Sequence, residues 1–179
     1  MKLTTLSLAL TLALSGLAQA QTSAQTPASL PASSEPTAFT MSSGTERTAE
    51  QLAMIFEKAD LSLKLDPQTR SVSGNAVLNF KANAVLKRLV LELDKNLKIE
   101  SVSINGKALH SEAISNPDGR LFLSLDQAMN KGETAEVNIR YQGVPRIAKR
   151  APWDGGFVWS QTSTGAPWIA SAVQGEGCD

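Results

Sequence analysis

Few side chains in this sequence combine the types and the spacing that catalysis needs. His110 is the only histidine and Cys178 the only cysteine. A cysteine nucleophile needs a base within hydrogen-bond reach, and His110 lies far from Cys178 in the sequence. We therefore expect Cys178 to be unpaired, or partnered beyond the end of this chain, rather than reactive. Glu176 is a solitary carboxylate in a glycine-rich tail, so we expect it to be solvated.

Three tryptophans gather near the carboxyl end. Trp153, Trp159 and Trp168 lie among glycines, and aromatic side chains of this size are costly to leave in water. Two interpretations stay open: the tryptophans pack where this domain docks on a neighbour, or they form a stacking platform for sugar rings. We prefer docking, because the chain ends on Q-G-E-G-C-D in the middle of what reads as a motif. We therefore expect the sequence to be the front part of a longer polypeptide.

The amino-terminal residues have the features of a secretory signal peptide. A charged start is followed by a leucine-rich run over 3–17 and by the small-residue triplet A-Q-A ending at Ala20. A membrane-spanning anchor needs about 20 apolar residues, and this run is shorter. We predict a signal peptide over 1–20, cleaved after Ala20, an exported protein that is periplasmic or secreted, and no transmembrane segment.

Residues 21–47 form a tract rich in Ser, Thr, Pro and Ala. Its few apolar side chains cannot offset the entropy lost on ordering it, so we predict a disordered linker. The remaining residues, 48–179, have the length of one ordinary domain. Because a single cysteine cannot cross-link the chain to itself, that domain must be stabilised by a packed core.

The charge distribution argues against one class of partner. Seventeen basic residues balance seventeen acidic ones, and no cluster of Lys and Arg alternates with aromatic residues. Nucleic acid is therefore not expected as a partner.

A two-residue hydrophobic period runs through the folded part and predicts β-strands. The alternating segments lie around residues 59–65, 72–80, 89–93, 97–104, 121–125 and 137–141. The run D-P-Q-T-R after Leu65 predicts the turn of a hairpin. Asn105-Gly106 and the run N-P-D-G from Asn116 predict two more turns. We therefore expect an all-β fold, an antiparallel sandwich or saddle.

Three places depart from simple alternation, and one later segment returns to it. Gly74 marks a possible bulge in its strand. The apolar spacing slips by one residue between Ile99 and Val102, which requires a bulge or a break. Residues 49–58 could form a short helix or could lead into the first strand. Residues 168–173 resume a strand-like pattern after the tryptophan-rich segment.

These segments together resemble a known family. The order of A-D-L-S-L-K-L-D, S-V-S-G-N-A-V-L-N-F, L-V-L-E-L-D, S-V-S-I-N-G, Y-Q-G-V-P and finally P-W-I-A-S-A-V-Q-G-E-G-C-D is similar to the amino-terminal domain of zinc metallo-aminopeptidases of the aminopeptidase N and leukotriene hydrolase type. The likeness runs over 59–179. It implies a β saddle that precedes a catalytic domain.

The resemblance assigns a role to Gln174. In that family the last strand of the first domain carries a Gln or Glu in a Q-C-Q-A or Q-C-E-A context, which reaches into the active site. Aligning A-V-Q-G-E-G on this context places Gln174 at the position that holds the free α-amino group of the peptide. This chain has Ala172-Val173 where many members have Gln-Cys. Without the resemblance, Gln174 would be read as an ordinary polar residue at a strand end.

The family's metal motif does not occur in this sequence. Its zinc is bound by an H-E-x-x-H helix and a downstream glutamate, and His110 alone cannot make a three-ligand site. The resemblance therefore implies that no catalytic residue, metal ligand or cofactor belongs to this chain, and that zinc is held by the missing catalytic domain.

Two functions follow as hypotheses. In the first, the chain is the amino-terminal domain of an exported zinc aminopeptidase that hydrolyses peptides from their amino ends; this piece contributes a scaffold and one substrate contact and is itself inactive. In the second, it is a free-standing secreted β-sandwich module that binds a glycan or protein ligand through its tryptophans. An H-E-x-x-H run encoded downstream would distinguish the two.

Overall fold

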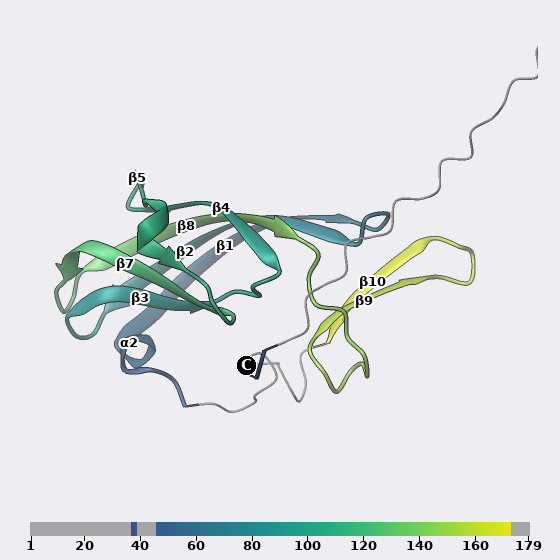
Figure 1. Ribbon diagram of the computed structural model, residues 1–179, viewed down its shortest axis with the longest axis horizontal. Helices are drawn as coiled ribbons and strands as arrows, with labels where there is room; N and C mark the ends of the chain where they lie inside the picture. The colour runs from purple at the N-terminus through teal and green to yellow at the C-terminus, as the bar shows by residue number, and fades with distance from the viewer. Residues whose placement is uncertain (1–36, 39–45, 173–179) are drawn as a thin grey trace, which may run out of the picture.

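A computed structural model describes residues 37–38 and 46–172 and confirms the all-β architecture (Figure 1). The predicted signal peptide over 1–20 and most of the predicted linker over 21–47 lie outside the described residues, as do Gln174, Glu176 and Cys178. The strands are β1 (Met54–Asp66), β2 (Ser71–Ala82), β3 (Leu86–Glu92), β4 (Leu97–Ile104), β5 (Lys107–Ala108), β6 (Ile114–Ser115), β7 (Arg120–Met129), β8 (Thr134–Gly143), β9 (Gly156–Gln161) and β10 (Pro167–Ala172).

The strands form three antiparallel sheets. A large sheet has the order β1-β2-β8-β4-β5, a small sheet has the order β3-β7-β6, and β9 and β10 form a two-stranded sheet. Figure 1 shows the small sheet beside one half of the large sheet, with the β9–β10 hairpin standing apart from both. The fold is therefore a sandwich over part of the large sheet only.

The core fills the space between the large and small sheets. Leu89 on β3 lies opposite Leu123 on β7, and both side chains are fully buried. From the large sheet, Val102 and Val137 reach the same core. These side chains occupy the alternate positions that the two-residue period picks out, because successive residues of a strand point to opposite faces.

The predicted turns are confirmed. Strands β1 and β2 pair in register from Asp66 opposite Ser71 to Lys58 opposite Asn79, and Asp66 Oδ1 accepts hydrogen bonds from the backbone N–H groups of Gln68 and Thr69. Asn105 and Gly106 have φ angles of 51° and 76° and join β4 to β5. Positive φ at both positions is what the two-residue hairpin turn requires.

One of the predicted irregularities is confirmed and another is wrong. The pairing of β4 with β8 shifts register between Ile99 and Ser101, which absorbs the slip in apolar spacing. The bulge predicted at Gly74 does not occur: Gly74 pairs in register with Leu63 on one side and Tyr141 on the other. The ring of Tyr141 covers the glycine, so the small residue makes room for a neighbour instead of breaking the strand.

Both interpretations of residues 49–58 hold in part. A four-residue helix, α2 (Ala49–Leu52), starts at an N-cap threonine, Thr48, in a capping box with Gln51. Strand β1 then begins at Met54. A 3-10 helix, η1 (Ser111–Ala113), is the other short helix among residues 46–172. In the part of the chain that the structure describes, no helix is long and apolar enough to span a membrane.

Candidate functional site

The β9–β10 hairpin is the element that leads to the predicted site residue. Strand β10 ends at Ala172, two positions before Gln174. The strand-like pattern predicted over 168–173 is confirmed by β10 as far as the described residues extend. The sequence pattern did not predict β9, because its residues do not alternate between polar and apolar types.

The two faces of this hairpin carry different tryptophans. Cross-strand partners share a face, and Trp159 lies opposite Ile169. Phe157 and Trp159 stack on that face with ring centroids 5.6 Å apart and an interplanar angle of 20°. Trp168 lies opposite Ser160, on the other face, and is 59% exposed. Trp159 and Trp168 therefore lie on opposite faces of the hairpin and do not share one stacking surface.

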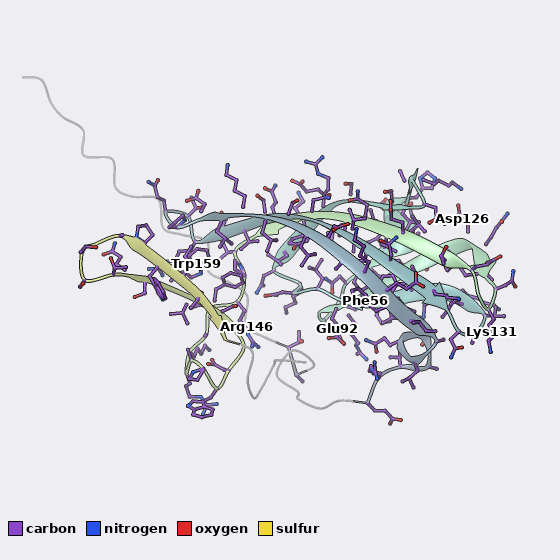
Figure 2. The ribbon with its side chains drawn as sticks, turned by 180° about the vertical axis from the view of Figure 1, so that it is seen from behind. Phe56, Glu92, Asp126, Lys131, Arg146 and Trp159 are labelled. Carbon is purple, nitrogen blue, oxygen red and sulfur yellow. The ribbon has the colours of Figure 1, made fainter. Side chains whose placement is uncertain are left out.

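The base of the hairpin is attached to the body of the domain through Arg146. Its backbone N–H donates to Asp94 Oδ2 at 3.0 Å, and its Nε donates to the carbonyl of Gly155 at 2.8 Å. The carbonyl of Arg146 accepts from the N–H of Phe157 at 2.8 Å. Figure 2 shows Arg146 at the end of the hairpin that is closest to the sheets, and Trp159 further along the hairpin. One residue thus joins the β3–β4 loop to the start of β9.

The loop before β9 is organised around a buried carboxylate. Asp154 is 7% exposed and accepts from the backbone N–H groups of Lys149 and, at 2.7 Å, Arg150. Burial pushes the pKa of Asp154 upward, but these backbone donors and the positive charge of Arg146 outweigh it and hold the pKa below 3.8. The carboxylate is therefore charged at neutral pH and fixes the path of the loop.

The other two aromatic features of this region differ in exposure. Trp153 lies in the same loop and is 62% exposed. The indole nitrogen of Trp159 is buried and has no hydrogen-bond partner among the described residues. An exposed indole offers a contact surface, whereas a buried N–H without an acceptor destabilises the fold unless an acceptor is supplied.

Of the titratable residues singled out from the sequence, only His110 lies among the described residues. His110 is exposed and precedes helix η1, on the part of the chain that also holds β5 and β6. Among residues 37–38 and 46–172, no group of three or more His, Cys, Asp or Glu could hold a metal ion. The described side chains therefore do not fit a zinc site.

Sequence reasoning missed Arg146 and Asp154. The run from Asp154 to Gly156 is typical of a turn, but it does not indicate the bonds of Asp154, because the donors Lys149 and Arg150 precede it in the chain. No local signal indicates the bond from Arg146 to Asp94, because the two residues lie 52 positions apart.

The chain resembles solved structures of one kind of enzyme. It superposes on a two-domain M1 zinc metallopeptidase bound to L-arginine with a TM-score of 0.55 and 22% sequence identity, covering 70% of this chain and 28% of that one. An M1 zinc metallopeptidase from Deinococcus radiodurans bound to a Tyr-Ser-Ala substrate gives a TM-score of 0.53 and 22% identity, over 69% of this chain and 27% of that one.

This chain has the fold of part of an M1 zinc metallopeptidase. It spans less than a third of the length of the structures that it matches. No family model and no curated protein matches it. At this level of identity the likeness concerns the fold, and it agrees with the resemblance drawn from the strand motifs.

Proposed function

We propose that this chain is the amino-terminal domain of an exported zinc metallo-aminopeptidase and that the full-length parent hydrolyses peptides from their amino ends. The supporting observation is the shared fold, which extends over 70% of this chain but only 28% of the matched two-domain enzyme. The catalytic domain of the parent would then lie in the rest of the polypeptide. That domain is the proposed partner of this chain.

In this proposal the β9–β10 hairpin presents Gln174 to the peptide substrate. Strand β10 leads toward Gln174, and the contacts of Arg146 hold the base of the hairpin on the domain. A glutamine amide oxygen is a neutral acceptor that suits the ammonium at the amino end of a peptide. Gln174 is therefore proposed to contribute recognition, while the large and small sheets contribute the scaffold.

Zinc is proposed to belong to the rest of the parent. The described residues do not fit a zinc site, and the full sequence has one histidine and no H-E-x-x-H run. We therefore assign no metal ligand and no catalytic residue to this chain.

The experiment compares the chain with its full-length parent. The parent should contain one zinc per polypeptide and release amino-terminal residues from peptides, and chelation should abolish that activity. The chain of 179 residues should retain no stoichiometric zinc after dialysis and should not cleave amino-acid anilides. Metal-dependent turnover by the chain alone, or a downstream reading frame without H-E-x-x-H, would contradict the proposal.

One observation favours a second candidate function, a secreted module that binds a glycan or protein ligand. Trp153 and Trp168 are 62% and 59% exposed, and exposed tryptophans are common contacts for ligands of both kinds. Glycan-array binding that is lost in Trp153→Ala and Trp168→Ala variants would support this alternative. Aminopeptidase activity of the parent would favour the first proposal.

A further inference from the structure

Strand β1 is an edge strand with an uncovered apolar row. It is 13 residues long, lies at the end of the large sheet and pairs only with β2 among the described residues. Leu61 and Leu63 are 60% and 54% exposed, and Leu65 is exposed as well. A long edge with exposed apolar side chains is a template for pairing with another strand.

The exposed leucines continue the core face of the large sheet. Leu61 lies opposite Ala76 and Leu65 lies opposite Val72, and both partners on β2 are buried. Cross-strand partners share a face, so the leucine row belongs to the apolar side of the sheet. The small sheet does not cover this row.

The opposite face of β1 carries charges of alternating sign. Lys58, Asp60, Lys64 and Asp66 occupy every second position except the central one, which is Ser62. In the monomer Lys58 contacts Asp60 at 2.6 Å, and both side chains are largely exposed. An exposed ion pair of this kind contributes little to stability, so these charges are available to other partners.

This pattern is complementary to itself. When two copies of β1 lie antiparallel about a two-fold axis at Ser62, Asp60 of each copy lies opposite Lys64 of the other. In the same register Lys58 lies opposite Asp66, so four cross-strand pairs have opposite charge. Two-fold symmetry repeats each contact, and opposite charges stabilise cross-strand pairs.

The leucine face supports the same register. Because the pairing is antiparallel about Ser62, Leu61 of one copy lies opposite Leu63 of the other. Both leucine rows then lie on one side of the joined sheet. The register therefore extends the apolar face across the two-fold axis without placing a charge on it.

Neighbouring registers bring like charges together. An axis at Leu61 places Lys58 opposite Lys64, and an axis at Leu63 places Asp60 opposite Asp66. A shift of the pairing by one residue turns the two leucine rows to opposite faces. The charges and the apolar row therefore select the same single register.

We propose that two copies of this chain associate through their β1 strands, antiparallel about Ser62, and join two five-stranded sheets into one continuous sheet. The strand that pairs with the exposed edge of β1 is thus β1 of a second copy of this chain. This inference stands on β1 alone and does not depend on the proposed aminopeptidase function.

Sedimentation velocity of the purified chain over a range of concentrations tests the association. We expect a reversible monomer–dimer equilibrium. Asp60→Lys and Lys64→Asp should each raise the dimer dissociation constant about tenfold to a hundredfold, because each replaces two attractive cross-strand pairs with two like-charged pairs. Lys87→Glu, at an exposed residue on β3 away from this edge, changes the net charge as much as Lys64→Asp and should leave association unchanged.

Mixing the two charge variants separates pairing from misfolding. The Asp60→Lys chain and the Lys64→Asp chain should associate with each other, since both cross-strand pairs are then of opposite sign. The double variant Asp60→Lys/Lys64→Asp should dimerise like the original chain. A monomer at every concentration, or a dimer that ignores all of these changes, would overturn the proposal.

A cross-link tests the register directly. Directly opposed residues of antiparallel strands have Cα atoms about 4.5–5.5 Å apart, which a disulfide can span. In a Cys178→Ser background, Ser62→Cys should therefore form a covalent dimer on mild oxidation. Ser73→Cys is the control, because it is partly exposed on the same face but lies on β2, between β1 and β8. Equal cross-linking of both variants would contradict the register.

Discussion

Gly74 and Tyr141 are cross-strand partners on β2 and β8, and the tyrosine ring occupies the space above the glycine. A Cβ atom added to Gly74 would lie 2.5 Å from Cζ of the ring. Glycine normally weakens a strand interior. Here it leaves room for the tyrosine ring to lie against the strand.

Gly74→Ala should destabilise the domain by about 1–3 kcal/mol, because the added methyl group forces the ring of Tyr141 to move. Chemical denaturation measures the free energy of unfolding. Ser73→Ala, at the neighbouring position on the opposite face, should change it by less than about 0.5 kcal/mol. If Gly74→Ala were as stable as the original chain, the position of the Tyr141 ring would not require a glycine at residue 74.

Tyr141 should lose its proton above the usual pH for tyrosine. Burial raises its pKa above 10.0, because the charged phenolate is poorly solvated there. The folded chain then keeps a proton that the unfolded chain has lost, so stability falls as pH rises past 10.0. Tyr141 is the only tyrosine, so phenolate absorbance reports it alone. Identical titration in the folded and urea-unfolded chain would contradict this.

Asp154 should make the loop before β9 sensitive to acid. Its folded pKa is below 3.8, so its contribution to stability is present above that pH and is lost as pH falls through the folded pKa. Asp154→Asn should be less stable than the original chain at neutral pH. We expect the difference in unfolding free energy to shrink progressively below pH 3.8. A difference that does not change with pH would show that the charge contributes nothing.

Gln174→Ala in the full-length parent tests the proposed substrate contact. Loss of a hydrogen bond to a charged group costs about 1.5–3 kcal/mol, or roughly tenfold to a hundredfold in kcat/KM. The loss should fall on substrates with a free amino end and leave thermal unfolding unchanged. Gln174→Glu should restore or raise activity, since the resembling family also uses Glu at this position. Unchanged kinetics in Gln174→Ala would show that Gln174 does not contribute to substrate binding.

Export should leave Gln21 as the first residue of the mature chain. The leucine-rich run and the triplet ending at Ala20 predict cleavage at that bond. Intact-mass analysis of the periplasmic or secreted protein should show Gln21 or its cyclised form. Recovery of a membrane-associated chain that retains Met1 would contradict the prediction.

The sequence by itself determined the longer strands of the two larger sheets and most turns of this protein. Alternation around residues 59–65, 121–125 and 137–141 predicted β1, β7 and β8, and Asn105-Gly106 predicted a turn whose positive φ angles the structure contains. These features depend on residues close together in the chain. The strand motifs also indicated the family whose fold the chain shares.

Only the tertiary structure decided how these elements meet. Strand β8 lies between β2 and β4, so Gly74 meets Tyr141 and is not a bulge. The bond from Arg146 to Asp94 spans 52 positions, and the leucines of β1 stay exposed because the small sheet does not cover that part of the large sheet. Such contacts join residues that are distant in the sequence. The spacing of residue types along the chain does not indicate which distant surfaces come together.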